Sequence, residues 1–453
     1  MKLRLTLAAT LVASFIAFDT AAQQPWLQDR RYGEGIGIRT GNLELHPGIA
    51  AELGYDSNYF KGAGDGSPQE EKVDALRFRV TPHLTLSTLG RQRLQGTGAA
   101  QPALNFDAGV YLAYNEIVFL DSDRSNDRNL GLGANLALDI QPGKPVGGDV
   151  YADYLRTVEP SSAASGAGEG VAESSFDRDS IRAGGGVSWR PGGGLFEWRF
   201  GYEIGFQLFE ADAFAGFNNT RHTFNTRGRW RFLPRTALLY DAHYQLVRFY
   251  NDTDQNDGEN IRSRLGLRGL VTNQLALLAM AGWAGSFYAP RGPIPARNYD
   301  DFIANAEVRW FLQPEPELQP GSAPVGLSSI GVGYARDFNT SYLGAFYRRD
   351  RGYIDAAYFI GGQILLSARG GVSHVSYPES FLGTGVSNPS FSENRVDAQL
   401  FAEYRPSDTI GVNTTLQYDR NFSGTPVLLD GMGNEDNLRY SRYQIFLGVR
   451  WFM

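Results

Sequence analysis

The chain ends in YSRYQIFLGVRWFM, residues 440–453, a stretch in which two kinds of side chain alternate. Counted back from the C terminus, every second position is apolar. These positions are Tyr443, Ile445, Leu447, Val449, Trp451 and Met453. The positions between them are mostly polar, with Phe446 and Phe452 as exceptions. A period of two predicts a β-strand with two different faces, which is what a barrel with lipid outside and water inside needs.

The same six apolar positions resemble the C-terminal signal of bacterial outer-membrane barrels. That signal usually ends in Phe, whereas this chain ends in Met453, with Phe452 one place early. The resemblance implies that the barrel-insertion machinery recognises this strand and that outer-membrane lipid surrounds its apolar face. The alternative interpretation is an edge strand of a soluble β-sandwich.

The composition points in the same direction. Aromatic residues make up 13% of the chain and glycines number 54, yet the mean hydropathy is only -0.30. Many strands that are apolar on one face only would give this combination. The absence of cysteine excludes a disulfide scaffold and a thiolate metal site. A net charge of -7 gives no support to a nucleic-acid partner.

The N-terminal segment, residues 1–22, has the pattern of a secretory signal peptide. Lys2 and Arg4 precede an apolar run from Leu5 to Phe18, and small residues follow at 20–22. Residues 23–42 are polar and carry no clear period, so we interpret them as a periplasmic N-terminal arm. No later segment approaches the roughly 18 continuous apolar residues of a membrane helix. The barrel is then expected over residues 43–453.

From residue 43 onward, strands with one apolar face follow one another. The clearest runs from Phe196 to Leu208, where aromatic and aliphatic residues occupy every even position. Between them lie charged residues such as Glu197 and Arg199. An arginine in the hydrocarbon layer would cost about 2–4 kcal/mol at mid-depth, so these positions must face water. Counting such segments predicts an all-β fold, a transmembrane antiparallel β-barrel of about 18 strands (roughly 16–20).

The connections between these segments alternate between short and long. Short ones include 191–194, 233–235, 272–273, 361–362 and 405–408, and long polar ones include 57–73, 159–175, 251–259, 378–392 and 422–439. This alternation is typical of outer-membrane barrels, and an even strand number places both termini at the short-turn, periplasmic end. The Pro-rich segment 313–324 is an exception, which we interpret as a stiff spacer; the alternative is a docking point for a periplasmic partner.

The polar face of the predicted barrel is where a function would lie. Its candidate lining residues are charged side chains at alternate positions of several strands. They are Arg199, Glu203, Arg227, Arg229, Arg231, Asp241, His243, Arg262, Arg264, Arg268, Glu307, Arg309 and Asp397. Because acids and bases are interleaved, one interpretation is a self-neutralising wall of ion pairs. The other is a selective lining, in which the arginines meet anionic groups on a passing polymer.

Catalytic and metal-binding patterns are weak in this sequence. Asp241 and His243 share one strand face, but no Gly-x-Ser-x-Gly or His-Glu-x-x-His motif accompanies them, so we interpret the pair as lumen lining. The acidic segment 252–259 resembles a calcium loop by composition, yet Ser263 stands where the bidentate Glu would be. We therefore expect no catalytic residue, no resident metal and no cofactor.

The opening of the predicted barrel resembles a known family. The segments LHPGI (45–49) and LGYDSN (53–58), followed by TPHLTL (81–86), are similar to the first two strands of the outer-membrane β-barrel porin type 2 family. That group includes the outer-membrane barrels of exopolysaccharide export systems. The resemblance implies a channel that gives a surface polysaccharide passage across the outer membrane, with a periplasmic export protein as its partner.

Two other roles stay open on the sequence alone. A general diffusion porin for small solutes would share the same strand pattern, and so would a surface barrel for adhesion or motility complexes. A small-solute porin should conduct ions in planar bilayers. An export barrel should be closed when alone and should be required for surface polysaccharide.

Overall fold

The computed structural model describes residues 37–62, 72–88, 103–120, 125–142, 144–158, 177–210, 212–250, 256–290, 296–312, 328–340, 346–361, 363–381, 387–423, 426–428 and 435–453. The predicted signal peptide, most of the predicted arm and the Pro-rich segment 313–324 lie outside these ranges. The described chain is almost entirely strand, with two short 3-10 helices, η3 (Pro191–Gly194) and η4 (Asp212–Phe217). Neither helix has the length and hydropathy that crossing a membrane would require.

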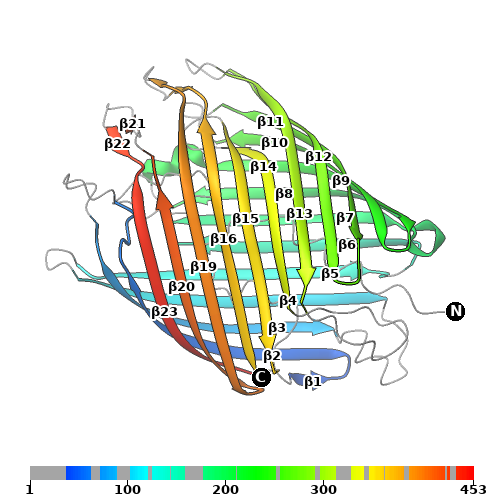
Figure 1. Cartoon of the computed structure of the whole chain (residues 1–453), viewed down its shortest axis with the longest axis horizontal. Coiled ribbons are helices and arrows are strands. Elements are labelled where there is room, and N and C mark those ends of the chain that lie inside the picture. Colours follow the sequence, from blue (N-terminus) through cyan, green and yellow to red (C-terminus); the bar gives the residue numbers. More distant parts are fainter. Residues whose placement is uncertain are drawn as a thin grey trace.

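One antiparallel sheet of 19 strands forms the molecule, and 18 of them close into a barrel (Figure 1). Each barrel strand pairs with the next along the chain, and the last pairs back to the first. This confirms the predicted all-β antiparallel barrel of about 18 strands. The barrel strands are β2 (Leu43–Asp56), β3 (Ala75–Thr88), β4 (Leu104–Phe119), β5 (Asp127–Ile140), β6 (Val146–Thr157), β7 (Arg178–Trp189), β8 (Phe196–Phe209), β9 (Asn219–Leu233), β10 (Thr236–Phe249), β11 (Gly258–Leu270), β12 (Leu275–Tyr288), β13 (Tyr299–Phe311), β14 (Ser329–Thr340), β15 (Phe346–Ile360), β16 (Ile364–Tyr377), β19 (Phe391–Ser407), β20 (Ile410–Asn421) and β23 (Tyr440–Phe452).

The remaining strands are short. β1 (Ile38–Thr40) lies within the predicted N-terminal arm and forms a hairpin with the start of β2. Two small sheets, β17 (Ser380–Phe381) with β18 (Ser387–Asn388) and β21 (Pro426–Leu428) with β22 (Glu435–Asn437), belong to the connections after β16 and β20. Figure 1 shows β1 and the C terminus together at one end of the barrel and β21 and β22 at the other. We call these the short-turn end and the long-loop end.

Two connections differ from the sequence prediction. β19 continues through Ser407, so the turn lies at 408–409 and not at 405–408. The register shifts between Tyr404 and Ser407, because Pro406 has no N–H to donate to the ladder. The second difference is at the short-turn end, where β3 ends at Thr88 and β4 begins only at Leu104, a connection as long as those at the opposite end.

The outer surface of the barrel is apolar along the middle of its strands. On β23, the side chains of Tyr443, Ile445, Leu447, Val449, Trp451 and Met453 are all exposed, and the residues between them are buried inside. The predicted insertion-signal residues therefore form one outward stripe. Large exposed apolar side chains continue around the barrel at alternate positions of the other strands.

The two rims of this surface differ in chemistry. Toward the short-turn end it carries Trp189, Trp230, Trp310 and Trp451. Toward the long-loop end, outward tyrosines donate their hydroxyl hydrogens to carboxylates. The pairs are Tyr55–Asp74, Tyr114–Glu116, Tyr154–Asp179, Tyr244–Glu259 and Tyr334–Asp350. Amphipathic aromatic side chains at both rims suit the two interfaces of a bilayer.

Apolar clusters also lie inside the barrel near the long-loop end. One joins Tyr59 and Val73, from the connection after β2, to Ile117 and Phe119 of β4. Another joins residues of β15, β16 and β19 to Leu438, which precedes β23. Segments of the long connections therefore pack inward against the wall.

Glycines make room for large side chains on the inner face. A Cβ on Gly133 would lie 2.2 Å from the ring of Tyr111, and one on Gly54 would lie 2.2 Å from the ring of Phe446. Each ring thus lies flat across a neighbouring strand. The inward ring of Tyr111 therefore packs against the neighbouring strand β5.

Candidate lumen site

The register of the strands decides which side chains face inward together. Glu197 on β8 pairs with Arg229 on β9, Arg227 with Asp241 on β10, and Asp241 with Arg264 on β11. Cross-strand partners point to the same face of the sheet. We call the inward face of β6–β11 the open wall, because its charged side chains are only partly buried.

The centre of the open wall is an aspartate between two arginines. Arg264 donates to Asp241 at 2.8 Å, and Arg227 lies 3.5 Å from the other carboxylate oxygen. The side chain of Asp241 keeps 22% of its surface exposed. His243 follows at the next inward position, between Asn225 and Arg262 in the register, and its ring makes no hydrogen bond within the described residues.

Neighbouring charges on the open wall are paired in the same way. Glu197 accepts hydrogen bonds from Arg229 at 2.5 Å and from Arg190 at 2.9 Å. Arg199 makes a bidentate pair with Asp149, with N···O distances of 2.5 and 2.7 Å. Charge-assisted bidentate pairs of this kind hold both side chains in one orientation.

Glu203 is held differently, because its partner in the described structure is the hydroxyl of Tyr151, at 2.6 Å. Arg231 donates to the carbonyl oxygen of Gly194 in the η3 turn, at 2.8 and 3.2 Å. The side chain of Arg268 makes neither an ion pair nor a hydrogen bond among the residues that the structure describes. Arg231 and Arg268 are therefore the two candidate arginines that form no direct ion pair with a carboxylate in the described part of the chain.

The other candidates lie on strands β11 to β19. Arg309 bridges Glu307, at 2.9 Å, and Asp355, at 3.2 Å. Arg351 pairs with Asp397 at 2.6 Å. These contacts again match each candidate cation to a carboxylate.

Arg262 reaches across two strands. It pairs with Asp337 of β14 at 2.7 Å and also donates to the carbonyl oxygen of Phe338. It is the one candidate whose partners lie three strands away in the barrel.

The opposite side of the lumen is a different kind of wall, which the sequence did not reveal. We call the inward face of β19, β20, β23, β2 and β3 the sealed wall, because most of its charged side chains, apart from Asp397 and Arg405, are almost fully buried. Asp56 of β2 accepts from Arg442 of β23 at 2.8 Å, lies 3.4 Å from Arg77 of β3, and accepts from Gln444 at 2.7 Å. Asp56 and Arg442 are 386 positions apart in the chain, so only barrel closure brings them together.

A second buried group lies toward the short-turn end of the sealed wall. Glu403 of β19 accepts hydrogen bonds from Arg450 at 2.5 and 2.6 Å and from Arg405 at 2.6 Å. The two aromatic residues that broke the polar pattern of β23 belong here as well. The guanidinium of Arg79 lies 4.2 Å from the ring centroid of Phe446, and that of Arg450 lies 4.8 Å from the ring of Phe452. Cation–π contacts thus explain why aromatic side chains occupy an otherwise polar face.

Metal binding has no support in the described ranges, where no group of three or more metal-ligating side chains comes together. The first half of the calcium-like segment 252–259, residues 252–255, lies outside those ranges. The chemistry that the described lumen can offer is therefore that of paired charges, hydroxyls and amides.

Comparison with known proteins gives structural similarity only. No family model matches the chain, and no curated protein sequence matches it. Among solved structures, the FrpB iron transporter from Neisseria meningitidis (F3-3 variant) is similar at 8% identity, with 92% of this chain and 82% of that chain covered and a TM-score of 0.45. Pseudomonas aeruginosa OccK7 (OpdD) is similar at 11% identity, with 91% and 99% covered and a TM-score of 0.45. Pseudomonas aeruginosa OpdQ is similar at 11% identity and the same coverage, with a TM-score of 0.42. Likeness at this level says nothing about substrate.

Proposed function

We propose that this protein is an outer-membrane channel that passes a hydrophilic substrate through its lumen. The observation that carries the proposal is the closed 18-stranded barrel with an apolar exterior and a polar interior. Barrels of this size leave an aqueous channel unless a segment fills it. Exposed apolar side chains in this number would be unfavourable in water and are expected to face lipid. The short-turn end, with β1 and the C terminus, would lie in the periplasm, and we infer the same side for the N terminus.

The finer proposal is that the substrate is a surface polysaccharide, received from a periplasmic export protein. The sequence resemblance of segments 45–49, 53–58 and 81–86 to the β-barrel porin type 2 family supports it. A lining of paired charges also suits a polymer that is largely neutral, because few unpaired ions would retain it.

Deletion of the gene tests the finer proposal. The surface polysaccharide should be lost, while the uptake of small solutes should be unchanged. Complementation with the wild-type gene should restore the polysaccharide. Normal surface polysaccharide in the deletion strain would refute the export role.

A second candidate function is general diffusion of small solutes. The partly exposed ion pairs of the open wall favour it, since a wetted and self-neutralised wall would discriminate little between small ions. Planar-bilayer recordings separate the two functions. Steady conductance from the purified protein alone would favour the porin, whereas a closed barrel that opens only with a periplasmic partner would favour export.

A further inference from the structure

The wall of the barrel has one incomplete junction, between β13 and β14. Their ladder ends at the pair Ala304 and Arg336. Both strands nevertheless continue toward the long-loop end, β13 back to Tyr299 and β14 on to Thr340. Along this length each strand stays paired with its other neighbour, β12 or β15. We call this stretch the β13–β14 break.

No other junction of the described barrel is open in this way. Elsewhere the ladder runs to the end of one of the two strands, with at most one terminal pair left over. The β3–β4 ladder also lacks two interior pairs at Thr81 and Pro82, but it resumes at His83. At β13–β14 the residues 337–340 have no partners on β13. At the rise of a strand this is roughly 13 Å of wall without a backbone ladder.

Side chains replace the missing backbone hydrogen bonds. Leu312 donates its N–H to the carbonyl of Ser328. Because the direction of the backbone groups alternates along a strand, the N–H and C=O groups of the even-numbered residues of β13 and β14 point toward each other. The next pair in that register would be Phe302 and Phe338. The N–H of Phe302 instead donates to the carboxylate of Asp301, at 2.7 Å.

The backbone of Phe338 on the facing strand also bonds to side chains. Its N–H donates to Asp337 at 2.8 Å, and its carbonyl accepts from Arg262. Backbone groups left unpaired in a lipid-facing wall would each cost several kcal/mol. Here Asp301, Asp337 and Arg262 satisfy three of the four backbone groups of Phe302 and Phe338 without closing the two strands.

The break is filled by aromatic side chains. The ring of Tyr299 is 5.3 Å from that of Phe338 and 4.1 Å from that of Phe346, measured between centroids. Phe338 and Phe346 are 2% and 4% exposed. On the lumen side this aromatic group meets Arg262 and Asp337.

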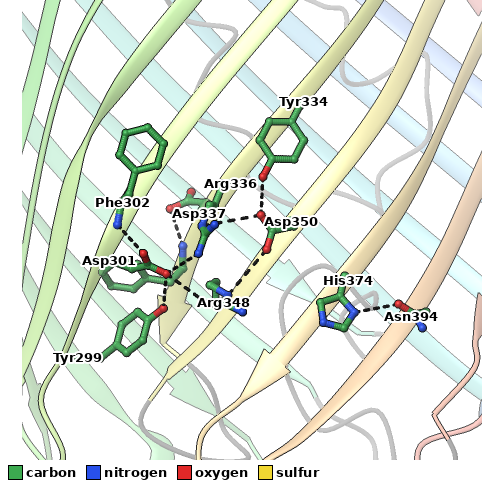
Figure 2. A network of polar contacts seen from close by, with 11 residues as sticks. Tyr299, Asp301, Phe302, Tyr334, Arg336, Asp337, Arg348, Asp350, His374 and Asn394 are labelled. Atoms are coloured by element: carbon green, nitrogen blue, oxygen red, sulfur yellow. Dashed lines mark hydrogen bonds and ion pairs between the residues drawn. The ribbon is translucent and has the colours of Figure 1, made fainter.

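On the outer side a network of ion pairs covers the break (Figure 2). Asp301 of β13 accepts from Arg336 of β14 at 2.7 Å and from Arg348 of β15 at 3.3 Å. Asp350 lies 3.8 Å from each of the two arginines and accepts from Tyr334 at 2.5 Å. Arg336 follows the exposed Val332 and Tyr334 at alternate positions, and Asp350 and Arg348 continue the row of the exposed Ile354, so these three side chains lie on the exterior of the barrel. Asp301 reaches them from β13, where it also accepts a hydrogen bond from the hydroxyl of Tyr299 at 2.8 Å.

We propose that the β13–β14 break is a side portal that binds an anionic amphiphile across the barrel wall. Its phosphate or carboxylate head would replace the carboxylates of Asp301 and Asp350 as the partner of Arg336 and Arg348. Guanidinium groups bind oxyanions of this kind well. Its acyl chain would take the place of the aromatic group. The rearrangement breaks no ladder, because side chains alone hold this part of the wall. The biological source of the amphiphile rests on the proposed outer-membrane location, whereas its binding does not.

The test uses the cysteine-free chain in detergent micelles. The double variant Phe302→Cys/Phe338→Cys places two cysteines where the next ladder pair would form, within disulfide reach once the break closes. A 16-carbon fatty acid with a diazirine near its tail is photolysed with the folded barrel, and the adducts are mapped by mass spectrometry. Retention of heat-modifiable mobility on gels shows that each sample is folded.

The portal predicts that adducts concentrate on residues 299–303 and 336–340 in wild-type and in the reduced variant. Oxidation should abolish them there, and reduction should restore them. Arg336→Gln/Arg348→Gln should lower the labelling about tenfold, because two charge-assisted contacts to the head are lost. Arg248→Gln is the matched control, since Arg248 pairs with Glu259 on the exterior of a complete junction; it should leave the labelling unchanged.

Adducts spread evenly around the barrel, or adducts that persist after oxidation, would overturn the portal. Acetate tests the head separately. If acetate competes as well as the unlabelled 16-carbon acid, the site binds anions only and the proposal of an amphiphile is wrong. Because the experiment is done in micelles, a failure of export or of conductance would leave its result unaffected.

Discussion

Two aspartates in this barrel each lie between two arginines but have different surroundings. Asp56 lies between Arg442 and Arg77 on the sealed wall, and Asp241 lies between Arg264 and Arg227 on the open wall. In both cases one arginine donates at 2.8 Å and the other lies near 3.5 Å. Asp56 also accepts a second hydrogen bond from Arg442 and one from Gln444. Asp56 is fully buried, whereas Asp241 keeps about a fifth of its side chain exposed.

The comparison shows that an aspartate between two arginines, here called the unit, has a different role in buried and in wetted surroundings. Where water is excluded, an ion pair cannot lose a partner without leaving a buried charge, so the unit locks the first, second and last barrel strands together. Where water reaches the pair, solvent screens the charges and the same unit is worth little for stability. There it leaves a wetted surface for a substrate.

Removal of the central aspartate should give the largest contrast. We expect Asp56→Ala to lower the free energy of unfolding by about 3–5 kcal/mol, since two buried arginines lose their counter-charge. Asp241→Ala should cost about 1 kcal/mol or less. Urea unfolding of the purified barrel, followed by gel mobility, measures both. Equal losses would contradict the distinction between the walls.

Packing on the two walls should differ as well, by a smaller amount. Gly54→Ala puts a Cβ 2.2 Å from the ring of Phe446, so the ring must move at a cost of about 1–3 kcal/mol. Gly205 is the matched site on the open wall, where the nearest atom to an added Cβ is 3.7 Å away. Gly205→Ala should change stability by no more than about 0.5 kcal/mol. The same urea series tests this, and a neutral Gly54→Ala would show that the sealed wall is loosely packed.

A change of charge on the open wall should alter the ion selectivity of the channel. Asp241→Asn leaves Arg227 and Arg264 partly exposed without their carboxylate, so the channel should shift toward anions. Reversal potentials in a salt gradient across a planar bilayer measure the shift. Asp300→Asn is the control, because Asp300 accepts from Trp283 on the exterior. An unchanged reversal potential for Asp241→Asn would mean that permeating ions do not approach this wall.

A third aspartate shows what happens when the neighbours are acids, and its effect should be the smallest. Asp177, just before β7, has a pKa raised to about 6 by burial and by the charge of Glu210. This pKa lies above the ordinary value of 3.8, so folding favours the protonated carboxyl of Asp177. The resulting contribution to the free energy of unfolding is complete below pH 4 and is lost as the pH rises through 6. Asp177→Asn should therefore stabilise the barrel slightly at pH 7, by about 1 kcal/mol or less because solvent reaches the group, and not at pH 4.

Thermal unfolding at the two pH values checks this prediction. The wild-type protein should lose stability between pH 4 and pH 7 relative to Asp177→Asn. If the two proteins show the same pH dependence, the carboxyl of Asp177 titrates normally.

The faces and limits of the strands were largely predictable from the sequence. The alternation in residues 440–453 gives both faces of β23, and the first strand begins and ends at the expected residues 43 and 56. Strand period depends only on near neighbours, so local pattern suffices. The turn after β19 was misplaced because Pro406 is tolerated in an irregular strand end, not only in a turn.

The two walls and the β13–β14 break could not be predicted in this way. Inward charges alternate equally well on both sides, and their burial depends on which strands become neighbours at closure. The break leaves the alternation of β13 and β14 intact. One local signal was present: an Asp-Phe pair occurs on each facing strand, at 301–302 and 337–338, and each Asp accepts the N–H of the Phe that follows it.

The account depends on a barrel with lipid outside and water inside, and two adjacent residues test this directly. Arg264 faces the lumen and Leu265 is exposed on the exterior of the same strand. In liposomes, a charged thiol reagent should modify Arg264→Cys and not Leu265→Cys. A fluorophore attached at Leu265→Cys beforehand should be quenched by brominated lipid, and one at Arg264→Cys should not. Equal modification of both cysteines by the charged reagent would contradict the account.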